Sequence, residues 1–270
     1  SDRFASILMD YLPGEDIHKL RERIMNNQNH NRTRRVSVED AVFFTADVML
    51  PLLKSMHHVG IVHRDVKPSN VVRKATDSRD FCIVDFGLSK SVIVAEDSDF
   101  CDKEHPWERG WLKPLNYKKM AGYYRKERAK ADFRGTSMYA SLRVHQGRDY
   151  CARDDIWSLL YVFCDLVAGG LPWMSYAANR DRAACERIKN WVHGDESVDH
   201  VEHLLMGDAY HLSVFKRERQ KEMRVERDKL TPVPEPLAMS KDRELVELMR
   251  KAFRHVGSLH FWDLPDYDLI

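Results

Sequence analysis

The sequence has 270 residues, of which 31% are charged and 43% hydrophobic, and its formal net charge is +1 at pH 7. This length allows one large domain or two small ones and is enough to bury a substantial core. The balanced charge argues against a nucleic-acid binder driven by bulk electrostatics and is consistent with an ordinary soluble enzyme. The longest mostly apolar runs contain an acidic residue and are too short for a bilayer, so we expect neither nucleic acid nor a membrane among the partners.

The cysteines and the first residues indicate the compartment. The five cysteines are odd in number, and none belongs to a Cys-x-x-Cys pair. This scatter is typical of reduced thiols in a cytoplasmic or nuclear protein, and it argues against a disulfide framework or a zinc site. The N-terminal "SDRFASILMD" has no basic-then-apolar signal pattern and no initiating Met. We therefore expect a cytoplasmic and/or nuclear protein whose chain was cut from something longer.

Three elements are predicted before residue 36. Residues 6–12, "SILMDYL", form a short apolar strand pattern that stops at the following "PG". Apolar positions within 15–25 recur at helical spacing, which predicts a helix there. A polar loop over 26–35 follows this helix.

A long helix is predicted next. Ser37 and Asp40 form a capping signal for a helix that continues to about His58. Pro51 conflicts with this helix, because a proline inside a helix costs about 3 kcal/mol unless a kink absorbs it.

The rest of the chain alternates short strands and helices. Residues 71–73 and 81–85 are strand candidates on either side of a polar hairpin. Residues 154–169 are apolar on nearly every face, which indicates a buried central helix. Residues 214–229 mix both charge signs at helical spacing, as a solvated helix face does, and 243–253 form an amphipathic helix. From residue 13 onward we expect a mainly helical fold.

Two short motifs indicate phosphoryl transfer. Residues 63–70 read "HRDVKPSN", and "DFG" begins at Asp85, twenty residues after Asp65. Phosphoryl transfer needs a carboxylate for the attacking hydroxyl, hard oxygen ligands for magnesium and a cation near the transferred phosphate. Asp65, Lys67, Asn70 and Asp85 supply these groups, and the two strings match known protein-kinase signatures. "DFG" alone is a weak signal, but the full loop followed by "DFG" at this spacing is a strong one.

With these motifs the chain resembles the eukaryotic protein kinases, and within them the casein kinase 1 group, which includes the tau-tubulin kinases. The resemblance rests further on "FRGTSMYAS" at 133–141, "ARDDIWSLLYVF" at 152–163 and "GGLPW" at 169–173. Most kinases carry Ala-Pro-Glu where this chain has "YAS", and loss of that Glu is typical of the casein kinase 1 group. The match covers roughly residues 5–175, and 240–270 more weakly.

The resemblance implies a mainly α fold, the helical C-terminal lobe of a protein kinase with short β-hairpins. Residues 1–12 would be the last strand of the N-terminal lobe and the hinge, and 13–270 the C-terminal lobe. A kinase also needs a Gly-rich loop over the phosphates and a strand Lys. No two glycines here are spaced Gly-x-Gly, and no Lys precedes Met9. We therefore expect the N-terminal β-lobe to be absent and the chain to be partial.

The resemblance also assigns roles within the catalytic site. Asp65 would be the catalytic base, and Lys67 would neutralise the γ-phosphate of ATP. Asn70 and Asp85 would hold Mg²⁺. Thr136 would bridge Asp65 and Lys67 from the substrate side, and its hydroxyl resembles Ser/Thr-specific kinases. The implied partner is a protein substrate with a Ser or Thr hydroxyl.

Further roles concern residues around this site. Met9 to Leu12 would form the gatekeeper and hinge, so that Asp10 and Leu12 lie at the adenine of ATP. Asp155 would brace the backbone of the catalytic loop, and a helix-capping Asp is the plainer interpretation. His57 and the next histidine are expected to be ordinary surface or core residues.

A long insert, about 91–131, separates the two halves of the site. Loops of such length are usually functional or disordered. Its basic end, from Arg125 to Lys130, could contact a phosphorylated substrate or the insert's own phosphate, as Arg64 could. A solvated basic helix is an equal alternative.

Two alternative functions belong to other classes. The first is a non-catalytic scaffold or pseudokinase-type binding module, although pseudokinases usually lose the catalytic residues that are present here. The second is a metal-dependent hydrolase that uses His63, Asp65 and Asp85. It fails because no second His or carboxylate cluster has ligand spacing.

Overall fold

The computed structural model describes residues 9–27, 34–107, 122–193, 198–206 and 241–270, together with residues 213, 217 and 220. The α-helices are α1 (Ile17–Asn27), α2 (Val38–Val42), α3 (Leu50–His57), α4 (Leu142–His145), α5 (Ala152–Ala168), α6 (Met174–Ala178), α7 (Arg182–His193) and α10 (Arg243–Ser258). The strands are β1 (Ile61–Val62), β2 (Val71–Arg73), β3 (Phe81–Ile83), β4 (Lys90–Ser91), β5 (Ile93–Val94), β6 (Cys101–Trp107) and β7 (Gly122–Arg125). A π-helix, η1 (Phe43–Met49), and the 3₁₀ turns η2 (Pro68–Asn70), η3 (Phe86–Leu88) and η4 (Val198–Leu205) complete the elements.

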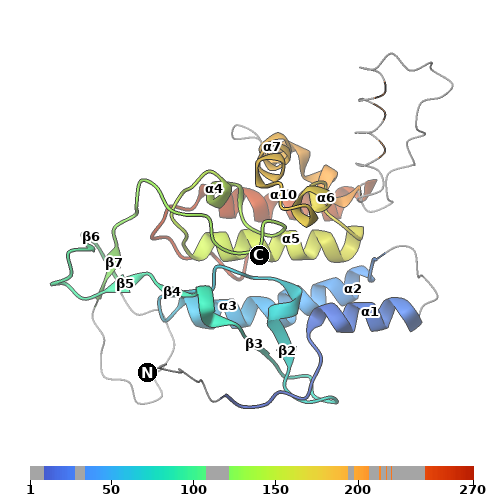
Figure 1. Cartoon of the computed structure of the whole chain (residues 1–270), viewed down its shortest axis with the longest axis horizontal. Coiled ribbons are helices and arrows are strands. Elements are labelled where there is room, and N and C mark those ends of the chain that lie inside the picture. Colours follow the sequence, from blue (N-terminus) through green and yellow to red (C-terminus); the bar gives the residue numbers. More distant parts are fainter. Residues whose placement is uncertain are drawn as a thin grey trace, which may run out of the picture.

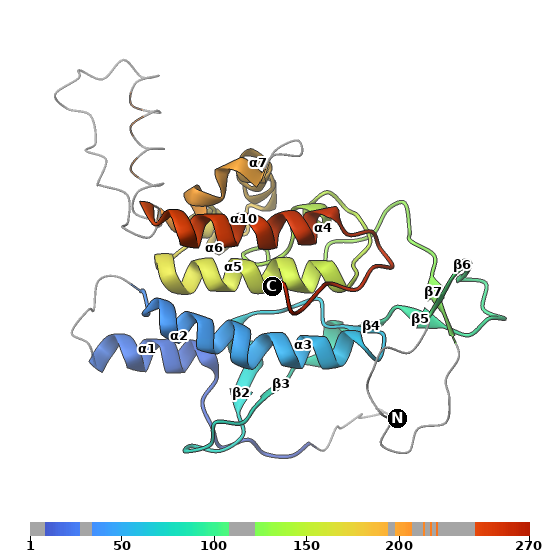
Figure 2. The ribbon, with the colours of Figure 1, turned by 180° about the vertical axis from the view of Figure 1, so that it is seen from behind.

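Helix α5 is the centre of the fold, as its apolar sequence predicted. Figures 1 and 2 show it between a layer formed by α1 to α3 and a layer formed by α6, α7 and α10. All of its residues except Trp157 are buried. It ends at Gly169, whose φ of 79° is a left-handed conformation that glycine adopts without strain. Helices α2, α3 and α10 and the strand β1 pack on this helix.

The long helix predicted from Ser37 to His58 forms, and the structure resolves its conflict with Pro51. The Ser37 side chain accepts a hydrogen bond from the backbone of Asp40 and so caps α2. Helix α3 begins at Leu50, one residue before the proline, and the stretch before it is the π-helix η1. The N–H of Leu50 bonds to the carbonyl of Thr45, five residues back. This wider turn accommodates a proline that a regular α-helix would not.

Two small antiparallel sheets, the β2–β3 hairpin and the pair of β1 with β4, flank the two motifs. Strands β2 and β3 pair with Val72 opposite Cys82, as predicted, and β1 pairs with β4. A backbone bridge from Asp16 to Val72 connects the start of α1 to the β2–β3 hairpin. Gly14 lies so close to β2 that an added Cβ would be 2.1 Å from the carbonyl oxygen of Arg73. The chain before α1 is therefore fixed against the hairpin.

The insert 91–131 contains a three-stranded antiparallel sheet in the order β5-β7-β6, which the sequence analysis did not predict. Figures 1 and 2 show this sheet projecting at one end of the molecule, beyond α4. Arg125 is the last residue of β7, and residues 126–130 have no helical structure. The alternative of a basic helix at Arg125 to Lys130 was therefore wrong, because β7 takes up the start of that segment. Residues 108–121 lie outside the described residues.

Two further predicted helices and one predicted strand lie at the two ends of the chain and in its last third. The amphipathic helix at 243–253 is confirmed as α10, capped by the side chain of Asp242. The strand predicted over 6–12 is not formed at 9–12, where no neighbouring strand of the described chain pairs with it; residues 6–8 lie outside the described residues. The helix predicted at 214–229 also lies outside them, apart from two single residues. Within the described parts, no helix has the length and apolar character needed to cross a membrane.

Candidate active site

Residues 63–70, the catalytic loop of the predicted motif, are held in place by Asp155, on the first turn of α5. Its carboxylate accepts hydrogen bonds from the backbone N–H of His63 at 2.7 Å and of Arg64 at 2.9 Å. It also lies 2.9 Å from Nε2 of His57, on the end of α3. Asp155 is fully buried, so these contacts replace the water that the carboxylate loses. This agrees with the bracing role that the resemblance implied.

Arg64 has a left-handed backbone, and Gly135 packs closely against its carbonyl. Its φ is 68°, a region that residues other than Gly, Asn and Asp seldom adopt, and its Nε donates to the carbonyl of Leu88. A Cβ at Gly135 would lie 2.4 Å from the carbonyl oxygen of Arg64, and Gly135 itself has a φ of 91°. Only glycine at this position lets the chain bring Thr136 against the catalytic loop.

The carboxylate of Asp65 is surrounded by three side chains that were predicted to lie near it. Lys67 donates to one oxygen at 2.6 Å, and the hydroxyl of Thr136 donates to the other at 2.6 Å. The amide of Asn70 donates to the backbone carbonyl of Asp65 at 2.9 Å. Burial alone would raise the pKa of Asp65, but the hydrogen bonds from Lys67 and Thr136 lower it below the ordinary value. Asp65 is therefore a charged, oriented acceptor at neutral pH.

Lys67 and Thr136 are also close to each other, with Nζ 3.4 Å from the hydroxyl oxygen. The structure thus brings together all three residues that were predicted to be catalytic. Their elements are distant in sequence: Asp65 and Lys67 precede η2, and Thr136 follows the insert. The side chain of Lys67 is 24% exposed, so its ammonium group can still contact a substrate.

Asn70 and Asp85 are the residues expected to hold magnesium. The backbone N–H of Val84 donates to the carbonyl of Asn70 at 2.9 Å, which fixes the residue before Asp85 beside Asn70. The side-chain N–H of Asn70 donates to the backbone carbonyl of Asp65. The amide oxygen of Asn70 is therefore the atom that could bind a cation. Asp85 is exposed, with a left-handed backbone (φ 64°, ψ 65°). A carboxylate and an amide oxygen suit Mg²⁺, which usually takes few protein ligands and completes its shell with phosphate and water.

No cluster of three or more His, Cys, Asp or Glu side chains able to hold a metal occurs among the described residues. Of the two residues expected to hold magnesium, one is a carboxylate and the other an amide, so they do not form such a cluster. Phe86 supports Asp85 by packing edge-on against His63, with ring centroids 5.6 Å apart. His63 in turn lies 3.0 Å from the carbonyl of Val84 through Nε2. The two motifs therefore pack on each other directly.

Asp10 and Leu12, the expected adenine contacts, lie in an extended segment without regular secondary structure. Asp10 is exposed and Leu12 half-buried. The bridge from Asp16 to Val72 places this segment beside the β2–β3 hairpin that connects Asn70 to Asp85. The location is compatible with a hinge, and the role in ATP binding stays a prediction.

A buried ion cluster beside the site was missed by the sequence analysis. Asp149 accepts two hydrogen bonds from the guanidinium of Arg128, at 2.7 and 3.0 Å, and pairs with Lys90 at 3.4 Å. Burial would raise the pKa of Asp149, but the bonds from Arg128 and the charge of Lys90 lower it to about 2. The cluster joins the insert to β4 and to the loop before α5. A lone Asp in "QGRDY" carries no motif that would reveal it.

Lys189 on α7 was also missed. It is fully buried, and its ammonium donates to the carbonyl oxygens of Ser137 at 2.9 Å, of Met138 at 3.4 Å and of Ala140. These carbonyls follow Thr136 directly, so Lys189 holds the segment that presents Thr136. A lysine within an amphipathic helix reads as a surface residue, which is why the sequence concealed it.

The "YAS" segment is anchored by hydrogen bonds to two buried carboxylates of α5. The hydroxyl of Tyr139 donates to Asp165 at 2.9 Å, and Asp165 pairs with the buried Arg21 at 2.8 Å. Burial beside Asp165 raises the pKa of Tyr139 well above its ordinary value, so the phenol stays protonated. Ser141 donates to Asp154 at 2.5 Å and caps α4.

The arrangement unites an oriented Asp65, a Lys, an Asn and a "DFG" aspartate around one loop, and a family comparison agrees with it. The model of the protein kinase domain matches residues 1–254. The chain belongs to the protein kinase family. The family match does not show that an N-terminal lobe is missing, and that expectation stays a prediction.

Three relatives show to which protein kinases the chain is similar. The kinase chain is 29% identical over 165 residues to a probable serine/threonine-protein kinase of Dictyostelium discoideum, covering 60% of this chain and 26% of the relative. It is 29% identical over 157 residues to a probable casein kinase I homolog of Encephalitozoon cuniculi, covering 58% of this chain and 43% of the relative. It is 30% identical over 158 residues to casein kinase I homolog 1 of Schizosaccharomyces pombe, covering 57% of this chain and 30% of the relative.

These relatives confirm the predicted likeness to serine/threonine kinases and to the casein kinase 1 group. The aligned part of this kinase spans less than half the length of each of the three relatives. Their names describe the relatives, and the activity of the whole protein that contains this chain is therefore a matter for proposal.

Proposed function

We propose that this chain is the catalytic part of a casein kinase 1-like protein kinase that transfers the γ-phosphate of ATP to Ser or Thr of a protein substrate. The observation that supports this most is the carboxylate of Asp65, which is charged and fixed between Lys67 and Thr136. Asp65 also shares its loop with Asn70, and the hydrogen bond from Val84 to Asn70 brings the "DFG" aspartate, Asp85, to the same place.

Asp65 would act on the attacking hydroxyl. Its oxygens, oriented by Lys67 and Thr136, accept the proton of the substrate hydroxyl as the oxygen attacks phosphorus. The ammonium of Lys67, 2.6 Å from Asp65 before substrate enters, turns toward the transferred phosphoryl group and neutralises its charge. The rigid support from Asp155 keeps both groups in place during this exchange.

Asn70 and Asp85 would hold Mg²⁺, and their donor set fits it. When bound, magnesium neutralises the nucleotide phosphates and orients them for in-line transfer. Asn70 is positioned for this by its hydrogen bond to the Asp65 backbone, so the metal ligand and the base share one loop. The segment from Asp10 to Leu12 would meet the adenine.

The preference for Ser and Thr is inferred from Thr136. Its hydroxyl donates to Asp65 at 2.6 Å and so closes the substrate side of the base. A hydroxyl at this position resembles Ser/Thr-specific kinases, and the likeness to a probable serine/threonine-protein kinase supports the same preference.

The test is phosphate transfer by the natural full-length protein to a generic acceptor such as casein, with radiolabelled ATP and magnesium. We expect transfer to Ser and Thr, and Asp65→Asn should lower turnover by about 10²-fold or more, because a positioned base and its charge are lost. Asp80→Asn is the matched control, since Asp80 is an exposed carboxylate on the β2–β3 hairpin. Equal turnover in the wild type and Asp65→Asn would refute the role of Asp65. Absence of turnover in a folded wild type would favour the non-catalytic scaffold.

A further inference from the structure

Lys189, on α7, binds the turn that follows Thr136 through three backbone carbonyls. Its ammonium donates to the carbonyl of Ser137 at 2.9 Å, to that of Met138 at 3.4 Å and to that of Ala140. The side chain of Lys189 is fully buried, so no water competes for these oxygens. A single cation of α7 therefore holds three carbonyls of the turn at 136–140.

Two further side chains hold the same carbonyls. The indole Nε1 of Trp173 donates to the carbonyl of Met138 at 2.7 Å. Nε2 of His145 lies 3.2 Å from the carbonyl oxygen of Ser137 and 3.3 Å from Nζ of Lys189. Burial and the nearby charge of Lys189 lower the pKa of His145 to about 3, so this imidazole is neutral near pH 7. Together these three side chains form a rigid polar support for the turn.

The charge of Lys189 is the central part of this support. An ammonium group has three N–H donors, one for each carbonyl, whereas a neutral amine has only two. Nζ also lies 4.7 Å from the ring centroid of Trp173 and 5.0 Å from that of Tyr161, and aromatic ring faces attract a cation. Burial lowers the pKa of Lys189 well below its ordinary value, and the carbonyls and rings oppose this effect by favouring the charged form.

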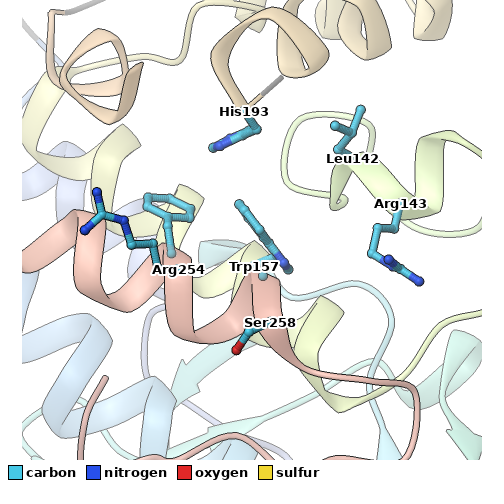
Figure 3. A pocket seen from close by; sticks show the side chains of 8 residues that line it. Leu142, Arg143, Trp157, His193, Arg254 and Ser258 are labelled. Atoms are coloured by element: carbon cyan, nitrogen blue, oxygen red, sulfur yellow. The ribbon is translucent and has the colours of Figure 1, made fainter. Parts of the chain in front are cut away.

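A role of Lys189 in a neighbouring pocket is the alternative. A pocket of about 410 Å³ lies between α4, α5, α7 and α10, and Figure 3 shows side chains that line it, among them Leu142 and His193. Lys189 is not one of the residues that line this pocket. It lies one helical turn before His193, and its ammonium contacts the turn at 136–140 instead. The contacts of Lys189 thus assign it to the turn.

The turn connects Lys189 to the carboxylate of Asp65. The backbone N–H groups of Tyr139 and Ala140 both donate to the carbonyl of Thr136 at 3.0 Å, so Thr136 belongs to the same hydrogen-bonded turn. The hydroxyl of Thr136 donates to Asp65 at 2.6 Å. A displacement of the turn by about 1 Å would lengthen this contact beyond the range of a hydrogen bond.

We propose that Lys189 is a positioning residue for phosphate transfer, which fixes the hydroxyl of Thr136 against Asp65 through the turn at 136–140. This inference rests on the proposed function and adds a residue of α7 to that site. Lys189 acts through Thr136, because its own contacts are with the backbone of the turn. Without its charge the carbonyls lose their donor, the turn shifts, and Asp65 loses one of the two hydrogen bonds that orient it.

The test compares Lys189→Met with Arg187→Met in the natural full-length protein, with casein as acceptor. Met has nearly the shape of Lys without its charge, and Arg187 is an exposed cation on the same helix. We expect Lys189→Met to lower kcat by about 10- to 100-fold with an unchanged KM for ATP, because a misplacement of about 1 Å at a catalytic group has effects of this size. Arg187→Met should leave both constants unchanged.

A double-mutant cycle with Thr136→Val separates positioning from general destabilisation. Val has the shape of Thr but no hydroxyl. In the Thr136→Val background, Lys189→Met should lower kcat by less than about twofold, because residues of one hydrogen-bond network do not act independently. Two losses that multiply would overturn the proposal, and so would a wild-type kcat in Lys189→Met. If Lys189→Met does not fold, the same cycle is measured with Lys189→Gln, whose amide keeps two N–H donors for the carbonyls.

A measurement that does not depend on turnover completes the test. The ¹³C NMR signal of the Asp65 carboxyl group at pH 7, assigned with Asp65→Asn, should shift in the Lys189 variant and stay in place in Arg187→Met. If the folded wild type transfers no phosphate, the proposed function fails, and this signal then decides the role of Lys189 by itself. An unchanged signal in the Lys189 variant would overturn the positioning of Thr136 by Lys189.

Discussion

The hydroxyl of Tyr267 lies 2.7 Å from Nδ1 of His57, although the two residues are 210 positions apart. The other nitrogen of this ring lies 2.9 Å from Asp155, which holds the backbone of the catalytic loop. A carboxylate only accepts, so Nε2 of His57 donates to Asp155, and Nδ1 is the nitrogen that meets the Tyr267 hydroxyl. Burial raises the pKa of Tyr267, which keeps this hydroxyl protonated. The C-terminal segment thus supports the catalytic loop through one imidazole.

Tyr267→Phe should therefore affect the active site as well as the fold. It removes a buried hydrogen bond and leaves Nδ1 of His57 unsatisfied, which costs about 1–2 kcal/mol of unfolding free energy. Denaturant unfolding measures this loss, and hydrogen exchange of the His63 and Arg64 amides should accelerate in parallel. Asp268→Asn is the control, because that side chain is 90% exposed and pairs with Lys54 at the surface. Unchanged exchange at both amides would contradict the coupling.

Asp85→Asn should raise the magnesium concentration that the full-length kinase needs. Asparagine tolerates the left-handed backbone of this position, so the substitution removes charge with little strain. A neutral amide binds Mg²⁺ more weakly than a carboxylate, so the midpoint of a magnesium titration at fixed ATP should move upward by about tenfold or more. A superimposable titration curve would show that Asp85 is not a metal ligand. Asp80→Asn, on the same hairpin, serves again as the matched control.

Asp149→Asn should alter the acid stability of the protein. The folded pKa of Asp149 is about 2, below the ordinary value of 3.8, so its contribution is complete above about pH 4 and is lost as pH falls toward 2. A shift of this size corresponds to about 2 kcal/mol at neutral pH. The variant should thus be less stable than wild type at pH 7, and the difference should shrink toward pH 2. Denaturant unfolding across this range checks it.

The control for this experiment is Asp132→Asn. Asp132 is 90% exposed and lies 3.9 Å from Arg134, so its removal should change stability by less than about 0.5 kcal/mol at any pH. A difference between wild type and Asp149→Asn that stays constant from pH 7 to pH 2.5 would contradict the link to titration.

The sequence revealed the catalytic site well, because its groups sit at short fixed spacings. Asp65, Lys67 and Asn70 share one loop, so their proximity follows from chain geometry alone. Apolar residues on nearly every face likewise indicated that α5 is buried. Thr136 and Asp155 required the family resemblance, because their contacts with the loop span 71 and 92 positions.

What the sequence concealed depends on contacts between distant segments. Lys189 and Asp149 carry no local signature, and each becomes informative only when buried against partners from another element. The sheet of the insert has strands of two to seven residues and an irregular register between Cys101 and Pro106, which obscures the alternation that predicts strands. The π-helix before Pro51 resolves a conflict that the sequence could only pose.

Residues 1–270 on their own should bind Mg²⁺-ATP weakly and transfer no measurable phosphate. They contain no Gly-x-Gly pair, so no Gly-rich loop within this stretch covers the nucleotide phosphates. A missing charge-assisted contact to the phosphates is worth roughly 1.5–3 kcal/mol, or more than tenfold in affinity. Calorimetric titration with ATP and magnesium, together with a radiolabel assay, measures both properties. Micromolar affinity or sustained turnover would show that these residues suffice for catalysis and that the phosphates are held by groups other than a Gly-rich loop.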